Sequence, residues 1–249
     1  MDNTTYIALS RQMALQNQLD VVANNLANVN TTGFKGADSL FAQYVFKLDQ
    51  NERAFKEKVA FVHDFGLVRN LSQGALNFTG NTFDVALQGE GYFAIQGRGG
   101  VENYTRAGVF TKNSEGFLVT MEGRLVLNTN AAPISIPQDA REIVIQGDGT
   151  IREPLGRVFG QLRVVRFENE RNLKQVDGTA FRADGEEAIP MQQPKVAQGV
   201  LEASNVTPVT EITRLIALNR AYQDVARMIS QEDDRKKKAA DVYIRPAQA

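Results

Sequence analysis

The sequence contains no cysteine, no tryptophan and a single histidine among its 249 residues. The lack of cysteine excludes disulfides, thiolate metal sites, iron–sulfur clusters and cysteine nucleophiles. One histidine excludes any site that needs two imidazoles, and no apolar run approaches the ~18 residues of a membrane span. These absences leave little catalytic equipment, so we expect no metal and no cofactor.

Charge of one sign is also lacking. The 28 Lys and Arg residues nearly balance the 29 Asp and Glu residues, for a formal net charge of −1, so the whole chain has no electrostatic attraction to nucleic acid. The polar, acidic start of the chain, followed by Arg11 and Gln12, does not match a cleavable secretory signal. With 43% hydrophobic residues, the composition is typical of a folded globular or assembly protein.

Apolar residues at heptad spacing predict a helix over the first thirty residues, with Gly33 as its stop. The apolar stripe consists of Leu15, Leu19, Val22, Leu26 and Val29. The opposite face is rich in amides rather than charges and includes Asn24, Asn25 and Asn28. This composition indicates packing against other polar surfaces.

A second helix is predicted near the end of the chain, with Thr207 as its cap and Pro208 at its first position. Its stripe consists of Ile212, Leu215, Tyr222, Ala226 and Ile229, with Asn219 in the gap of the register. The mixed charge run at 232–238 is interpreted as a solvated helix end.

Between the helices, short segments alternate with period two and are separated by glycine-containing turns, which predicts an antiparallel β-domain. The segments lie at 83–87, 125–127, 143–145 and 162–167. The expected fold is therefore α+β, with a helix at each end of the chain and a central antiparallel β-rich domain. The expected divisions are 1–33 (N-terminal helix), 34–80 (extended or mixed connecting segment), 81–198 (β-rich domain) and 199–249 (C-terminal helix and tail).

The terminal stripes favour an assembly protein over a self-contained enzyme. Each predicted helix of ~25 residues is roughly 37 Å long, and helices of this kind need tertiary contacts to be stable. The helices must therefore pair with each other, pair with other subunits, or fray.

Motifs for catalysis fail their context tests. His63-Asp64 has the only histidine, no nucleophile elbow occurs, and Gly89-Glu90-Gly91 precedes strand-like rather than helical residues. Gly147-Asp148-Gly149 is interpreted as a hairpin turn. We therefore predict no catalytic residue, no enzyme activity and no small-molecule substrate.

Two alternatives remain open. A glycosidase needs only two carboxylates at a suitable separation, and the candidates are Asp84, Glu90, Asp148 and Asp184. A carbohydrate-binding module would need exposed aromatic residues on the β-domain, such as Tyr92, Tyr104 or Phe117.

Two segments resemble those of a known family. The segment at 19–35, which contains Asn24-Asn25-Leu26-Ala27-Asn28-Val29 and ends in Thr31-Thr32-Gly33-Phe34-Lys35, resembles the N-terminal signature of bacterial flagellar rod and hook proteins. The segment at 198–206 resembles the one that opens their C-terminal helix, and 80–87, 89–93 and 104–110 are similar to their β-domain motifs. Within the family, the two ends of the chain are most similar to a proximal-rod subunit, with a distal-rod subunit as the alternative.

This resemblance implies a structural role without enzymatic activity. It implies that the N- and C-terminal helices form a coiled-coil-like bundle, and that the subunits assemble with copies of themselves and with other rod proteins into a rod that crosses the periplasm. It also implies export through the flagellar type III export apparatus without a cleaved signal. The expected assembly interface comprises Leu15, Leu19, Val22, Asn24, Asn25, Leu26, Asn28, Ile212, Leu215, Tyr222 and Ile229. We further hypothesise that Asn24, Asn25 and Asn28 pair across subunits and set the register.

Overall fold

The computed structural model describes residues 2–47, 58–140, 142–154 and 156–244. The chain forms two compact units. The first, which we call the helical unit, comprises Met1–Ala27, Ala37–Arg69 and Thr207–Ala249. The second, which we call the β unit, comprises Asn28–Gly36 and Asn70–Val206. The chain therefore crosses between the units four times.

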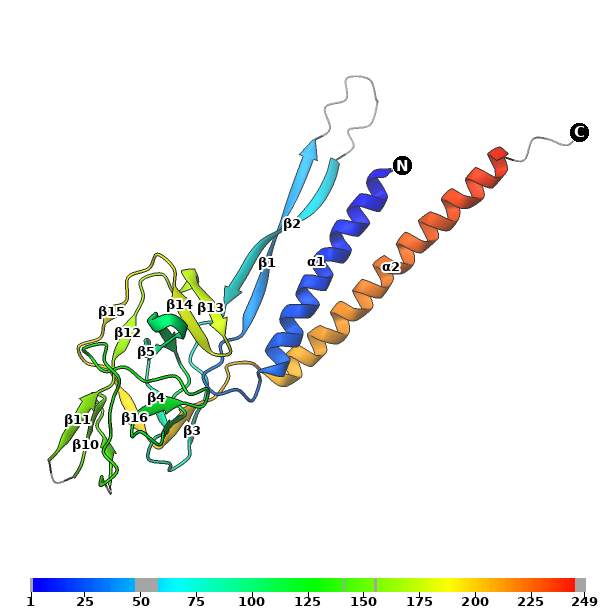
Figure 1. The fold of residues 1–249 in the computed structure, drawn as a ribbon. Helices are drawn as coiled ribbons and strands as arrows, with labels where there is room; N and C mark the ends of the chain where they lie inside the picture. Colours follow the sequence, from blue (N-terminus) through cyan, green and yellow to red (C-terminus); the bar gives the residue numbers. More distant parts are fainter. Residues whose placement is uncertain (1, 48–57, 141, 155, 245–249) are drawn as a thin grey trace, which may run out of the picture. The chain divides into compact units, whose positions relative to one another are not determined.

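The helical unit is built on two antiparallel helices that lie side by side (Figure 1). They are α1, Asp2–Ala27, and α2, Pro208–Ile244. Lys236 Nζ donates to Thr5 Oγ1 over 3.2 Å at one end of the pair, and Asn25 Nδ2 donates to Glu211 Oε2 over 3.4 Å at the other. A hairpin of strands β1 (Ala37–Lys47) and β2 (Lys58–Arg69) packs against α1.

The helix boundaries follow local chemistry. Pro208 occupies the first position of α2, as predicted, and the Glu211 amide donates to the Thr207 carbonyl oxygen over 3.1 Å. At 37 residues, α2 is longer than the predicted ~25, and it includes the charge run at 232–238. Helix α1 ends at Ala27, well before Gly33, because residues 28–36 join the β unit.

The β unit is antiparallel throughout its described strands. Its largest sheet has the order β13-β14-β6-β5-β12-β15, and the smaller ones are β11-β10-β9, β16-β4, β17-β3 and β7-β8. The strands are β3 (Leu76–Phe78), β4 (Val85–Leu87), β5 (Tyr92–Gln96), β6 (Glu102–Thr105), β7 (Phe110–Lys112), β8 (Leu118–Thr120), β9 (Val144–Ile145), β10 (Thr150–Arg152), β11 (Val158–Gln161), β12 (Val164–Arg166), β13 (Leu173–Asp177), β14 (Ala180–Ala183), β15 (Ile189–Pro190), β16 (Val196–Gln198) and β17 (Val200–Glu202).

Two buried clusters form the core of the β unit. In the first, Phe93 and Phe110 meet edge to face with centroids 5.4 Å apart. In the second, Tyr104 and Phe167 do the same at 4.8 Å. Both separations lie in the favourable range for aromatic pairs, so a unit of short strands is held together largely by its side-chain packing.

The prediction of an α+β chain with a helix at each end and an antiparallel β-rich middle is confirmed. Three of the four predicted β segments contain a regular strand (β4, β9 and β12), whereas 125–127 makes only isolated bridges, such as that between Ile95 and Val126. Gly147-Asp148-Gly149 forms the predicted turn, between β9 and β10. The expected connecting segment 34–80 is divided: its middle forms the β1–β2 hairpin of the helical unit, and its ends belong to the β unit.

Candidate assembly interface

The two helices meet along an apolar seam. Ala8, Leu15 and Val225 are buried there. The α2 residues that pack against them are Leu218, Ala221, Tyr222 and Ile229. We call this set the helix seam.

The α1 residues predicted for the assembly interface lie mostly inside the chain's own fold. Leu15 and Val22 are buried, and Leu19 and Leu26 are half-buried. Part of this burial comes from the β1–β2 hairpin, which packs against α1 alongside α2. The predicted stripe therefore marks a buried face, and whether it also meets another subunit stays a prediction.

The three asparagines occupy different environments. Asn25 is buried: its Nδ2 donates to the Ala37 carbonyl oxygen over 2.9 Å and its Oδ1 accepts from the Ala37 amide over 3.0 Å. Asn24 is exposed on α1. Asn28 lies in the β unit, where its Oδ1 accepts from Thr31 Oγ1 over 3.1 Å. The structure therefore uses the amide of Asn25 to fix the start of β1 next to the end of α1.

On α2 the buried register differs from the predicted one. Tyr222 and Ile229 belong to the helix seam, but Leu218 and Val225 accompany them in place of Asn219 and Ala226. The exposed Asn219 accepts a hydrogen bond from Gln223. Leu215 is half-buried and Ile212 is 44% exposed. The gap that Asn219 made in the predicted stripe disappears in the observed seam.

Two exposed apolar stripes lie on the helices, and sequence reasoning predicted only one of their residues, Ile212, as part of the assembly interface. On α1, Tyr6, Leu9 and Met13 are 62%, 47% and 63% exposed. On α2, Val209, Ile212 and Ile216 are 74%, 44% and 50% exposed. Both sets have the spacing i, i+3, i+7 that aligns side chains on one helix face. The spacing alone could have identified them, but only the structure separates them from the buried faces.

The two stripes lie at opposite ends of the helix pair. The Thr5–Lys236 contact places the start of α1 beside the end of α2, and the Asn25–Glu211 contact places the start of α2 beside the end of α1. An exposed apolar patch on a folded chain commonly marks an interaction surface.

The two signature segments meet inside the β unit. Gly33 N donates to the Glu202 carbonyl oxygen over 2.7 Å, and Lys35 Nζ forms an ion pair with Glu202 Oε1 at 2.6 Å. Both side chains of the ion pair are 1% exposed, and Arg106 Nη1 lies 3.6 Å from Glu202 Oε2. Burial lowers the pKa of Lys35, while the contact with Glu202 acts in the opposite direction. The two signature segments thus contact each other and join the N- and C-terminal parts of the chain within the β unit.

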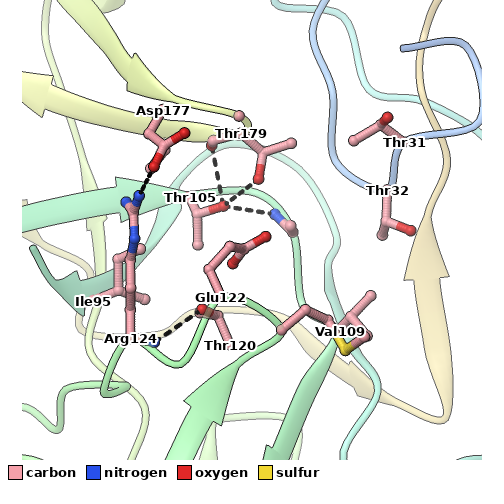
Figure 2. Close-up of a pocket in the computed structure, with 14 residues that line it drawn as sticks. Thr31, Thr32, Ile95, Thr105, Val109, Thr120, Glu122, Arg124, Asp177 and Thr179 are labelled. Carbon is pink, nitrogen blue, oxygen red and sulfur yellow. Dashed lines mark hydrogen bonds and ion pairs between the residues drawn. The ribbon is translucent and has the colours of Figure 1, made fainter. Parts of the chain in front are cut away.

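The β unit also contains a cavity of about 200 Å³. Figure 2 shows Thr31 and Thr32 on one side of it and the Arg124–Asp177 ion pair, 2.6 Å long, on another. Thr105 Oγ1 donates to the Thr179 carbonyl oxygen over 3.1 Å. None of the four carboxylates proposed for a glycosidase lines this cavity.

Those four carboxylates have structural surroundings. Asp84 is buried and accepts from Thr79 Oγ1 over 2.7 Å, and Glu90 is exposed. The backbone amide of Thr150 lowers the pKa of Asp148, and the Arg182 side chain lowers the pKa of Asp184. A glycosidase general acid requires a raised pKa, so the last two do not suit that role.

The aromatic residues proposed for carbohydrate binding are not exposed as that model requires. Tyr92 and Tyr104 are buried in the second core cluster, and Phe117 is half-buried. Their burial explains the strand pattern around them and removes two of the three proposed binding surfaces.

In the described part of the chain, neither helix has a stretch apolar enough to cross a membrane. The same residues contain no group of three or more His, Cys, Asp or Glu side chains that could hold a metal ion.

Three family models match consecutive parts of the chain. The "Flagella basal body rod protein" model matches residues 6–35, the "Flagellar hook protein FlgE/F/G D1 domain" model matches 86–153, and the "Flagellar basal body rod FlgEFG protein C-terminal" model matches 197–242. The first and last cover the two signature segments, which the structure brings together.

Curated relatives agree along nearly the full length. The chain is 39% identical over 246 residues to the flagellar basal-body rod protein FlgF of Caulobacter vibrioides, covering 97% of this chain and 98% of the relative. It is 36% identical over 251 residues to FlgG of Agrobacterium fabrum (92% and 94%) and 33% identical over 249 residues to FlgF of Escherichia coli (94% and 95%).

The chain therefore belongs to the flagellar basal-body rod protein family. It is a structural subunit of the basal-body rod.

Proposed function

We propose that this chain is a subunit of the proximal rod, equivalent to FlgF, that assembles with copies of itself and with other rod proteins to transmit torque across the periplasm. Within one organism, Caulobacter vibrioides, the chain is 39% identical to FlgF and 31% identical to FlgG, which supports this assignment. The alternative is a distal-rod subunit equivalent to FlgG. Export of the chain through the flagellar type III apparatus, without a cleaved signal, belongs to the same proposal.

Assembly proceeds through the terminal helices, which join neighbouring subunits in coiled-coil-like contacts. The observation that carries this proposal is the pair of exposed apolar stripes at opposite ends of the helix pair. Such contacts are stabilised by roughly 25 cal/mol for each Å² of apolar surface that they remove from water. Two different surfaces that bind each other form a heterologous interface, which extends into a helical filament when the rotation does not close.

The predicted interface residues divide into two roles under this proposal. Ile212, which is exposed, contacts a neighbouring subunit directly, and the exposed Asn24 can do the same. Leu15, Tyr222 and Ile229 act indirectly, because they belong to the helix seam that holds the two helices together and so keeps the stripes in place. Val22 is buried and acts within the fold of the chain.

The role is structural rather than enzymatic. The relatives are rod proteins, and the pKa shifts of Asp148 and Asp184 oppose acid catalysis. Of the residues proposed for saccharide binding, Tyr92 and Tyr104 form part of the core. We assign no substrate, cofactor or nucleic acid to the chain.

The proposal is tested by complementation. The wild-type gene is expected to restore motility to a strain that lacks its FlgF and not to one that lacks its FlgG; the opposite result would assign the chain to the distal rod. Met13→Glu and Ile216→Glu should fold but fail to restore motility, because each places a charge in an apolar contact. Val158→Glu is the matched control, since Val158 is an exposed apolar residue of the β unit. Normal motility with both stripe variants would refute assembly through these surfaces.

A further inference from the structure

The chain passes between the two units at four points, which we call the crossings. The segments next to these crossings are hydrogen-bonded to one another within the β unit. The crossings follow Ala27, Gly36 and Arg69 and precede Thr207. Residues next to three of them, Gly36, Asn70 and Asn205, are joined by hydrogen bonds even though up to 169 positions separate them.

The side-chain amide of Asn205 makes most of these bonds. Its Oδ1 accepts from Gly36 N over 2.9 Å, and its Nδ2 donates to the carbonyl oxygens of Asn70 and Ser72, each over 2.9 Å. The Asn70 amide completes the set by donating to the Gly36 carbonyl oxygen over 2.7 Å. One side chain therefore holds together the ends of three crossings.

The buried Lys35–Glu202 ion pair is next to the hydrogen bonds of Asn205. Lys35 precedes Gly36, and Glu202 lies three residues before Asn205. Lys35 Nζ also donates to the Ser72 carbonyl oxygen over 2.7 Å, and Glu202 Oε1 accepts from Gly74 N over 3.1 Å. The remaining crossing, after Ala27, leads into the segment 28–36, in which Gly33 N donates to the Glu202 carbonyl oxygen. The β-unit segments that begin or end at the four crossings are therefore all bonded to one cluster.

We propose that Asn205 and the neighbouring Lys35–Glu202 ion pair form a mechanical anchor. The anchor distributes force over the four crossings when torque passes between the two units. The inference rests on the proposed function, because torque passes through this chain only if it is a subunit of the rotating rod. Residues Asn205, Lys35 and Glu202 are positioning residues in this role, and we call them the anchor.

The physical reason is the way in which bonds share a load. Strands β3 and β17 are three residues long, so tension on one crossing alone would open their pairing one hydrogen bond at a time. When the segments are cross-linked, several bonds must break in the same event, which requires more force. The buried charges strengthen this effect, since separating them would leave each one unpaired in a desolvated site.

Single-molecule pulling on the full chain tests the anchor directly. The chain has no cysteine, so Arg227→Cys in the helical unit and Val158→Cys in the β unit supply two unique attachment points at exposed positions. In this background, Asn205→Ala is expected to lower the force at which the β unit ruptures. Asn172→Ala is the matched control: its side chain donates to Glu186 Oε1 over 2.6 Å, within the β unit and away from the crossings. Asn205→Ser, a milder truncation, serves if the alanine variant does not fold.

The outcomes separate the anchor from the proposed function. An unchanged rupture force for the Asn205 variant, or an equal loss for Asn172→Ala, overturns the anchor. In cells, the Asn205 variant should restore swimming in dilute medium and lose it as viscosity, and therefore load, is raised; swimming equal to wild type at every viscosity also overturns it. If the wild-type gene itself fails to rescue either rod-deficient strain, the proposed function fails, while the pulling result stands by itself.

Discussion

Lys35 Nζ lies 2.6 Å from Glu202 Oε1, and both side chains are 1% exposed although 167 positions separate them in the chain. Neither group could be buried without the other, because an isolated charge in a desolvated site is strongly destabilising. This pair therefore makes the folding of the β unit depend on segments from both ends of the chain.

Replacing the buried cation measures that dependence. Lys35→Met should lower the free energy of unfolding by about 3 kcal/mol, the lower end of the range for breaking a buried pair, because Arg106 still lies 3.6 Å from Glu202. Urea unfolding followed by circular dichroism is the measurement. Lys174→Met is the control: it removes a lysine that is 69% exposed and paired with Asp184, and pairs of this kind are worth at most ~1 kcal/mol. Equal losses in the two variants would contradict the prediction.

A glycine comparison tests the close contact of the signature loop. Gly33 has φ +69°, and a Cβ there would lie 2.4 Å from Ala107 N. Gly99 has a similar φ, +77°, with nothing within 4 Å of the added atom. Gly99→Ala should therefore cost only the ~1–2 kcal/mol of left-handed strain, whereas Gly33→Ala should cost more because backbone atoms must move apart. Thermal unfolding of both variants provides the comparison, and a similar melting temperature for the two would show that the loop tolerates the extra atom.

The buried Tyr104 predicts a loss of stability in alkaline solution. Burial is the main cause that raises the pKa of Tyr104 from 10.0 to about 12. The phenol keeps its proton in the folded chain at pH values where the unfolded chain has lost it. The stabilisation that this difference gives the folded state is therefore complete below pH 10 and is lost as the pH rises from 10 to 12. A shift of this size corresponds to roughly 3 kcal/mol of stability.

The measurement is the difference in unfolding free energy between the wild type and Tyr104→Phe from pH 9 to 12. Phenylalanine keeps the ring that packs against Phe167 and removes the titration, while every other titrating group is shared. The wild type should lose its relative stability as the pH rises; a difference that stays constant would place the pKa near its ordinary value.

The helix seam is tested by a pair of substitutions on the same helix. Val225→Asp puts a carboxylate into the buried contact with α1, whereas Met228→Asp changes a residue that is 42% exposed. We expect Val225→Asp to lower the stability of the helix pair by several kcal/mol, because the buried charge is unpaired. Circular dichroism should show this as a weaker helical signal or a lower melting temperature. Met228→Asp should change both only slightly. A stable helix pair in the Val225→Asp chain would show that the seam does not hold the helices.

Local signals were sufficient for the main elements. The Thr207–Pro208 start of α2, the 147–149 turn and the period-two segments were predictable because each depends on residues a few positions apart. The ends of the elements were less predictable. Helix α1 ends at Ala27 because the next nine residues join the β unit, and no local sequence pattern indicates this. The β1–β2 hairpin was missed for the same reason, since its packing against α1 is long-range.

The candidate interface shows the limit more sharply. Heptad spacing identified Tyr222 and Ile229 as seam residues, but it placed Asn219 and Ala226 where Leu218 and Val225 lie. Two apolar stripes on one helix have the same period, and only a packed partner decides which one is buried.

The sequence by itself determined the periods, the turns and the signature segments, because these are properties of residues close together in the chain. The tertiary structure decided which helix faces are buried, where the stripes are exposed, and that Lys35, Glu202 and Asn205 meet. Those outcomes depend on desolvation and on contacts across more than 160 residues, which no local pattern encodes.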